Sequence, residues 1–247
     1  MKKNEMIFGP HAVIEAIQAG KEIDKILVRR GDLRSELLKE LLSTLKGLDI
    51  PLQRVPAERL DRITAKNHQG VIAFLPDVDY HRLEDLIPAI FEDGRNPFIV
   101  LLDGVTDVRN FGAIARTCEC AGVDAIVIPM KNSVTVNSDA VKTSAGALHV
   151  LPVCKEKSIK QAIRFLQASG IKVVAASEKA ADNYTSIACD TPIAIVMGAE
   201  DTGVSSDNLR IADHIVKIPL FGTINSLNVS VASSIIIYEV VRQRQRS

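Results

Sequence analysis

The chain has 247 residues, of which 47% are hydrophobic and 24% are charged, and its 30 basic and 30 acidic side chains leave no net charge. This length and hydrophobic content allow one large core or two smaller ones, and they exclude an intrinsically disordered chain. Zero net charge argues against an unfocused electrostatic attraction to nucleic acid, so any nucleic-acid site must be local.

Residues 1–76 are expected to form a small α/β domain. Apolar runs at residues 26–28 and 71–75 are typical of strands. Leucines at helical spacing from Leu33 to Leu45 predict a helix that ends near Gly47. The segment holds 13 basic and 10 acidic residues and is therefore mildly basic.

Residues 77–94 differ in composition, with one basic residue, six acidic residues, Pro88 and Gly94. This composition predicts an acidic linker that contains at most one short helix, over residues 83–91.

Residues 95–247 alternate short apolar runs with helical segments, including a long apolar helix over residues 229–241. Uniformly apolar runs are typical of parallel strands covered by helices on both faces. The ligand crevice of such a doubly wound sheet lies beyond the carboxyl ends of its strands. The expected strands are 98–102, 125–128, 150–153, 173–176, 193–197 and 215–218.

Three loops at those strand ends carry polar or glycine-rich sequences. They are Asp103–Arg116, Met197–Val204 and Ile218–Ala232. Alone, each loop has an ordinary interpretation: Asn110, Ser226 or Asn228 could cap a helix, and the glycines of the second loop could form a simple turn. Gly112 near a helix start costs about 1 kcal/mol against alanine, which indicates that something approaches the backbone there, such as an RNA phosphate.

Together, the loops closely resemble the three signature motifs of the SpoU/TrmH branch of the SPOUT RNA methyltransferases. The motifs are N-x-G-x-x-x-R, then G-x-E-x-x-G, then I-P-x with S-L-N-V-S-V-A. The resemblance covers residues 95–247 and implies a parallel-sheet domain with a trefoil knot, homodimerisation through that domain, and methyl transfer from S-adenosylmethionine to a ribose 2′-hydroxyl. The family loop has a small residue where this chain has Asp201.

The resemblance also implies site residues. Arg116 is the expected catalytic residue, but a guanidinium is practically never neutral, so we expect it to orient the target and to stabilise a developing alkoxide rather than act as a base. An ordinary ion pair with Glu119 or Asp107 is the alternative. The expected catalytic set is Arg116, Asn110, Glu200, Ser226 and Asn228, and the expected cofactor-binding set is Gly198, Ala199, Ile218, Leu227, Asn228 and Thr143.

Two amino-terminal segments, Ile7–Val13 and His68–Val71, resemble the RNA-binding domain of the subgroup that methylates a guanosine in bacterial large-subunit (23S) rRNA. That domain is expected to be ribosomal-protein L30e-like. Basic residues that could contact phosphates, or could simply be solvated, are Arg29, Arg30, Arg34, Arg59, Arg62 and Lys66. The basic tail 242–246 has the same two interpretations.

The sequence leaves two alternatives to this function and argues against a third. A tRNA 2′-O-methyltransferase and a non-catalytic RNA-binding ribosome-assembly protein share the fold. A nicotinamide-dependent oxidoreductase would need a G-x-G-x-x-G fingerprint, which the chain lacks. Neither the cysteines nor the histidines have metal-ligand spacing, and no apolar run nears the roughly 20 residues of a membrane span, so we expect a cytoplasmic protein without metal.

Overall fold

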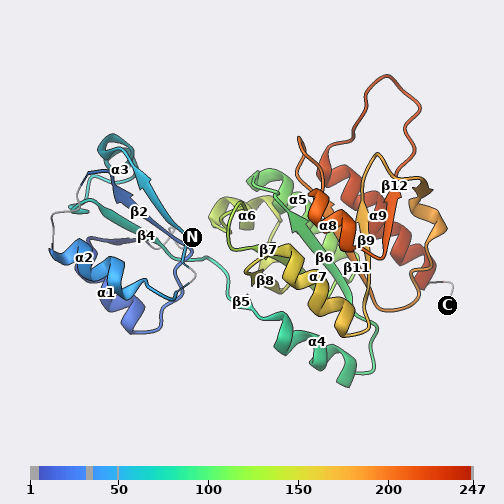
Figure 1. Ribbon diagram of the computed structural model, residues 1–247, viewed down its shortest axis with the longest axis horizontal. Coiled ribbons are helices and arrows are strands. Elements are labelled where there is room, and N and C mark those ends of the chain that lie inside the picture. The colour runs from blue at the N-terminus through green and yellow to red at the C-terminus, as the bar shows by residue number, and fades with distance from the viewer. Residues whose placement is uncertain (1–5, 32–35, 49, 246–247) are drawn as a thin grey trace. The chain divides into compact units, whose positions relative to one another are not determined.

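The structure is a computed structural model that describes residues 6–31, 36–48 and 50–245. The chain divides into two compact units, Met1–Asp77 and Val78–Ser247 (Figure 1).

The first unit is a four-stranded sheet in the order β1-β4-β2-β3, with β1 and β2 antiparallel to β4 and β3 parallel to β2. Alternate residues of β2 enter two different cores: Ile26 and Val28 pack with α1 and α2, and Leu27 packs with Leu60 of α3. The elements are β1 (Met6–Phe8), α1 (Pro10–Gln18), β2 (Lys25–Arg29), α2 (Glu36–Thr44), β3 (Leu52–Val55), α3 (Ala57–Ile63) and β4 (Val71–Phe74).

The second unit is an eight-stranded, entirely parallel sheet in the order β10-β12-β9-β11-β6-β7-β8-β5. Its strands are β5 (Tyr80–His81), β6 (Phe98–Asp103), β7 (Ala125–Pro129), β8 (Val153–Glu156), β9 (Lys172–Ala176), β10 (Asp182–Asn183), β11 (Ile193–Gly198) and β12 (His214–Lys217). Its helices are α4 (Leu83–Glu92), α5 (Val108–Cys120), α6 (Ser138–Thr143), α7 (Ile159–Ala168), α8 (Ser206–Ile211) and α9 (Val229–Arg244), with short 3-10 turns η1 (Ala147–His149) and η2 (Tyr184–Ser186).

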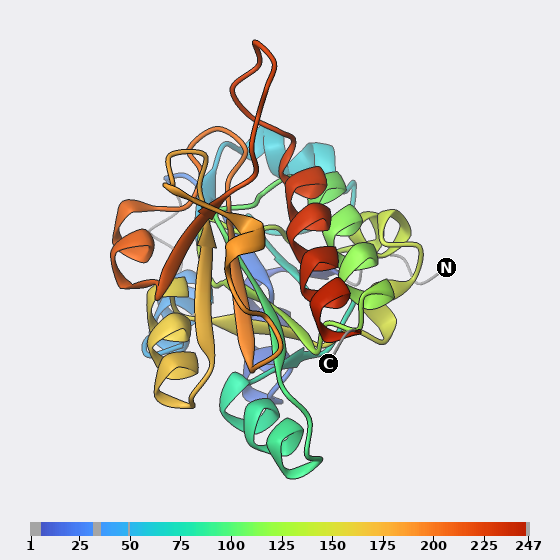
Figure 2. The same cartoon turned by 90° about the vertical axis from the view of Figure 1, so that its right-hand side faces the viewer.

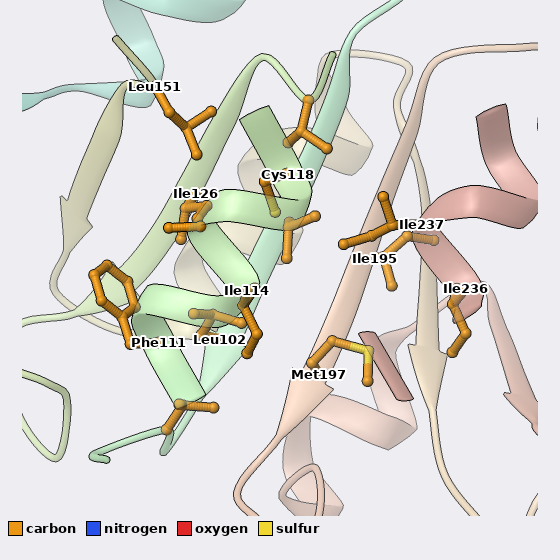
Figure 3. Packing of buried hydrophobic residues seen from close by; sticks show 14 of the residues in the cluster. Leu102, Phe111, Ile114, Cys118, Ile126, Leu151, Ile195, Met197, Ile236 and Ile237 are labelled. Carbon is orange, nitrogen blue, oxygen red and sulfur yellow. The ribbon is translucent and has the colours of Figure 1, made fainter. Parts of the chain in front are cut away.

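Helices cover both faces of this sheet, as the uniformly apolar strands predict (Figure 2). Helices α5, α6 and α9 pack on one face, where Phe111 and Ile114 of α5 lie against Leu102 of β6 (Figure 3). Helices α4, α7 and α8 cover the other face, which receives Ile99 and Leu101 of the same strand. Among the described residues, no helix is long and apolar enough to cross a lipid bilayer.

Two segments differ from expectation. The stretch 77–94, expected to be a linker, contributes β5 to the large sheet and α4 to its core, because Leu83, Ile87 and Ile90 are buried. The strand expected at 150–153 begins only at Val153. Leu151 is buried in a turn while Val150 is 70% exposed, so this apolar run marks a core contact rather than a strand.

Two arginines at the basic end of α9 have partners within the protein. Arg242 is paired with Glu239 at 2.6 Å. The half-buried Arg244 donates to the carbonyls of Asn96, Pro97, Thr191 and Cys189, at the amino ends of β6 and β11. Burial lowers the pKa of Arg244. Arg246 lies outside the described residues.

The close neighbour of Gly112 is protein. A Cβ built on Gly112 would lie 2.6 Å from Cβ of Thr143 and 3.0 Å from the backbone nitrogen of Ser144. The absent side chain therefore lets α6 pack against α5, and the RNA phosphate suggested for this position is wrong.

This packing gives a prediction with a definite sign. In an open helix, Gly112→Ala would stabilise the fold by about 1 kcal/mol. Here the added methyl group overpacks the contact with Thr143, so we expect a loss of about 1–3 kcal/mol and a lower Tm in thermal unfolding. The double variant Gly112→Ala with Thr143→Gly should recover part of the loss, and a higher Tm for Gly112→Ala would contradict the packing.

Candidate active site

Two of the three motif loops start side by side. In the parallel sheet, Gly198 at the end of β11 is paired with Asp103 at the end of β6. The loop after β6 leads into α5, which carries Asn110 and Arg116, and the loop after β11 carries Glu200. The third loop, residues 218–228, runs from β12 to α9.

One cluster of side chains joins all three loops. The Asn110 amide donates from Nδ2 to Oε2 of Glu200 at 3.0 Å. The Asn228 amide donates from Nδ2 to Oε1 of Glu200 at 3.1 Å and to Oδ1 of Asn110 at 3.0 Å. Residues as much as 118 positions apart therefore form one hydrogen-bonded group.

Other hydrogen bonds nearby show which residues cap the helices. Asp107, rather than Asn110, caps α5, because its Oδ1 accepts from the backbone nitrogens of Arg109 and Asn110 at 2.9 Å. Asn228 caps α9, because its Oδ1 accepts from the Ser230 backbone nitrogen at 3.0 Å. Asn228 therefore uses its oxygen for the helix and its nitrogen for the cluster.

Glycines shape the loop that presents Glu200. A Cβ on Gly198 would lie 1.9 Å from the carbonyl carbon of Gly203, so only glycine fits. Gly203 has a φ of +67°, and its nitrogen donates to the Ala199 carbonyl at 2.8 Å. This tight closure leaves Glu200 and Asp201 exposed at the tip.

Arg116 lies on the exposed side of α5, two turns after the helix start. Among the described residues its guanidinium has no hydrogen-bond or ion-pair partner, so neither Glu119 nor Asp107 engages it. Glu200 orders Asn110 but does not bind Arg116. The charge is therefore available to a ligand.

The other expected cofactor and catalytic residues occupy different surroundings. Ser226 lies in an exposed stretch, residues 220–226, of a loop that projects from the sheet (Figures 1 and 2). Ile218 and Leu227, at the two ends of this loop, are half-buried. Ala199 follows Gly198 beside Gly104.

Thr143 has contacts of another kind. It packs against Gly112 and donates from its hydroxyl to the Asp139 carbonyl at 2.8 Å. It also lines a surface hollow together with Asp107 and Arg109. These contacts belong to the packing of α6 on α5, so the structure does not group Thr143 with Gly198, Ile218 or Leu227.

The basic residues of the first unit are exposed on several elements. Arg59 and Arg62 lie on α3, and Lys66 places its ammonium group 5.2 Å from the centre of the Phe8 ring. Arg30 donates from Nε to the Arg54 carbonyl at 3.4 Å, and Arg29 ends β2. Arg34 lies outside the described residues.

Sequence reasoning missed Asp103 and Asp107. Oδ2 of Asp103 accepts from the Ser205 nitrogen and from Nδ2 of Asn208, both at 2.8 Å, and so ties the end of β6 to the start of α8. A carboxylate directly after a buried strand was the available signal for Asp103. For Asp107, the signal was an aspartate three residues before Asn110 at a helix start.

The described residues contain no group of three or more histidine, cysteine or acidic side chains that could hold a metal ion. The four cysteines are free thiols. Burial raises the pKa of the Cys154 thiol to about 12 and also raises the pKa of Cys118 and Cys189. These buried thiols are therefore poor nucleophiles and poor metal ligands.

Comparison with known sequences matches both units. A sequence profile of the SpoU rRNA Methylase family matches residues 97–238, and a profile described as RNA 2′-O ribose methyltransferase substrate binding matches residues 6–81. A protein of Staphylococcus haemolyticus (strain JCSC1435) named as a TrmH family tRNA/rRNA methyltransferase is 36% identical over 98% of this chain and 96% of its own length. A protein of the same name from Staphylococcus aureus (strain MSSA476) is 35% identical over 98% of this chain and 97% of its own length.

Solved structures give the same picture of the fold. The SpoU methyltransferase AviRb from Streptomyces viridochromogenes, in complex with AdoMet, is similar over 98% of this chain and 91% of its own, with a TM-score of 0.62 and 22% identity. An AdoMet-bound rRNA methyltransferase from Sinorhizobium meliloti is similar over 96% of this chain and 86% of its own, with a TM-score of 0.61 and 25% identity. A TrmH/SpoU tRNA modifying enzyme from A. aeolicus is similar over 66% of this chain and 85% of its own, with a TM-score of 0.57 and 30% identity. These matches confirm the resemblance drawn from the three motifs.

The double role of Asn228 can be separated by substitution. Asn228→Ala removes both the α9 cap and the cluster contacts, and should cost about 1–2 kcal/mol of folding free energy. Asn228→Ser restores a capping oxygen but cannot reach Glu200, so it should recover most of the Tm measured by calorimetry. Equal losses in the two variants would show that the cap contributes little.

Asn228→Asp adds a pH test. The variant keeps the cap but sets a second carboxylate against Glu200, which disfavours ionisation of both and raises their pKa values in the folded state. Its stability relative to Asn228→Ser should therefore be lowest near neutral pH and improve as pH falls through the carboxyl range. A pH-independent difference between the two variants would refute the contact with Glu200.

Proposed function

Because the chain belongs to the SpoU rRNA methylase family, and is thereby an S-adenosylmethionine-dependent RNA methyltransferase, we propose that it methylates the ribose 2′-hydroxyl of a guanosine in 23S rRNA. The observation that carries the proposal is the hydrogen-bonded cluster of Asn110, Glu200 and Asn228, which unites the three motif loops at the carboxyl edge of the sheet. Transfer to the 2′-oxygen is supported by the substrate-binding profile matched by residues 6–81.

The choice of rRNA is supported by the first unit. It has two cores of its own and exposed basic residues, so it suits a separate RNA-binding module. The rRNA methyltransferase from Sinorhizobium meliloti is similar over 96% of this chain, whereas the tRNA modifying enzyme from A. aeolicus is similar over 66%. A tRNA substrate is the second candidate, since the named relatives are tRNA/rRNA methyltransferases.

The residues at the strand ends fit the cofactor. S-adenosylmethionine supplies the activated methyl group when bound. The exposed residues 220–226 and the tight Gly198–Gly203 turn could offer the main-chain donors and acceptors that an adenosyl group needs. We assign binding of S-adenosylmethionine to Gly198, Ala199, Ile218, Leu227 and Asn228. Thr143 is the less favoured member of the set, because this residue of α6 packs against α5.

The side chains contribute geometry and charge. Glu200 fixes the amides of Asn110 and Asn228, so the cluster is pre-organised before substrate binds, which is where much of the rate of a displacement reaction originates. Arg116, exposed and unpaired in the described part of the chain, orients the target phosphate and stabilises the alkoxide that develops on the 2′-oxygen. We include Ser226, from the exposed stretch 220–226, in the proposed catalytic set.

Three further properties follow from the family and are part of the proposal. The carboxyl-terminal domain forms a trefoil knot, it pairs with a second copy to give a homodimer, and the first unit has a ribosomal-protein L30e-like fold. A cytoplasmic location is proposed because ribosomal RNA is modified there.

The decisive experiment transfers labelled methyl from S-adenosylmethionine to unmodified large-subunit rRNA and to bulk tRNA. Mapping the product by resistance to alkaline cleavage should reveal one 2′-O-methylated guanosine in rRNA. Label in tRNA alone would replace the rRNA substrate with tRNA. Cofactor binding without transfer to either RNA would favour a non-catalytic ribosome-assembly role.

Arg116→Ala should reduce methyl transfer by at least about 10²-fold, because the charge that stabilises the alkoxide is lost. Equilibrium binding of S-adenosylmethionine should stay near wild type. Arg164→Ala, which removes an exposed arginine from α7, is the matched control and should retain activity. Loss of folding in Arg116→Ala, seen by circular dichroism, would mark Arg116 as structural instead.

The role of the first unit can be tested on α3. Arg59→Ala with Arg62→Ala should weaken binding of an rRNA fragment and reduce the salt dependence of log Kd by about 1.4, the value expected for two contacts to single-stranded RNA. Cofactor affinity should not change. The control is Lys21→Ala with Lys39→Ala, which removes the same charge from elsewhere in that unit. Unchanged RNA affinity in the α3 variant would refute the assignment.

A further inference from the structure

A second hollow opens at the carboxyl edge of the large sheet. Its volume is about 450 Å³, and it lies between the loops that follow β6, β7, β8 and β11. Three lysines line it, Lys131, Lys157 and Lys160. We call it the lysine hollow.

The acidic groups of the lysine hollow are already engaged. Oδ2 of Asp103 accepts two hydrogen bonds, from Ser205 and Asn208, and Asp207 accepts from Nζ of Lys160 at 2.9 Å. The Lys160 pairing lowers the pKa of Asp207. Lys131 and Lys157 are both exposed, and the lining holds three lysines against two aspartates, so basic side chains outnumber acidic ones there.

The lysine hollow adjoins the site. Thr202 and Gly203, which line it, belong to the same short loop as Glu200. Two residues of extended chain span at most about 7 Å, so Thr202 lies close to the catalytic cluster. Gly203 also contacts Gly198, so the lysine hollow borders the loop that holds two of the expected cofactor residues, although Gly198, Ile218 and Leu227 do not line it.

We propose that the lysine hollow binds a backbone phosphate of the substrate RNA, one that neighbours the nucleotide being methylated, through Lys131 and Lys157. This inference rests on the proposed function. A phosphate fits better than a base, because no aromatic ring occurs among the described residues that line the hollow and single-stranded bases are held largely by stacking. Contact with a phosphate fixes the register of the RNA, so these lysines are positioning residues.

The first test measures equilibrium binding of an rRNA fragment that contains the methylation site. Lys131→Ala with Lys157→Ala should raise Kd about tenfold and reduce the salt slope of log Kd by about 0.7, as expected when one phosphate of single-stranded RNA is no longer neutralised. Binding of S-adenosylmethionine and the Tm should be unchanged. Arg164→Ala removes one positive charge from α7 outside the hollow and should leave both the Kd and the slope near wild type.

The second test identifies the ligand atoms. Single methylphosphonate substitutions remove one phosphate charge at a time, and substitution at one position beside the target nucleotide should weaken binding to the wild-type protein. The same substitutions should have no further effect on the double variant, because contacts shared by both changes are not additive. Wild-type affinity and slope in the double variant, or equal sensitivity of both proteins to every substitution, would overturn the proposal.

The RNA-binding and methyl-transfer experiments distinguish failure of the phosphate site from failure of the proposed function. If the RNA affinity falls as expected but wild-type protein transfers no methyl group, the phosphate site stands and the proposed 2′-O-methylation is wrong. If wild-type protein methylates the RNA and the double variant binds it equally well, the proposed function stands and the phosphate site is wrong.

Discussion

The side-chain amide of Asn228 is the interaction on which the arrangement of the site depends. Its oxygen caps α9 and its nitrogen holds both Glu200 and Asn110. An asparagine can do this because one group carries an acceptor and two donors on opposite sides. Serine or aspartate could cap the helix equally well, but neither could also donate to the Glu200 carboxylate from that place.

The parallel sheet makes this arrangement possible. Every strand of the second unit ends at the same edge, so loops from distant parts of the chain meet there. Helix α9 is held at both ends, by Asn228 at its start and by the contacts of Gln243 and Arg244 with the loop 187–191 at its finish. A hydroxyl contact between Thr117 and Ser234, at 3.1 Å, fastens its middle to α5. The helices that carry Asn110, Arg116 and Asn228 therefore pack together on one face of the sheet.

The sequence alone predicted the parts of the fold that depend on apolar periodicity. Five of the strands expected in the second unit match β6, β7, β9, β11 and β12 within a residue or so at each end, because continuous burial leaves a continuous apolar run. Short strands such as β1, β3, β5 and β10 were missed, because two to four residues carry too little pattern. The family and the cofactor followed from three motifs in order, which no single motif would have supported.

Partners were harder to predict than elements. Spacing indicated that something approaches Gly112 but could not say that it is Thr143. In the same way, the basic residues after Val241 suggested solvent or RNA, whereas Arg244 binds four backbone carbonyls. The carbonyls that Arg244 binds lie more than 50 residues from it along the chain. Contacts of this kind are set by the folded chain rather than by local sequence.

The reach of those contacts also governs when the protein can finish folding. Arg244 binds the carbonyl of Asn96, 148 residues earlier, and Asn228 binds Asn110 across 118 residues. During synthesis the first unit can assemble its cores early, since its contacts are local to about 77 residues. The second unit must wait, with β11 made but α9, the helix that packs on it, still untranslated. For that interval the nascent chain exposes part of an apolar sheet face and is prone to aggregation. The interval lasts until α9, near the end of the described residues, has been translated.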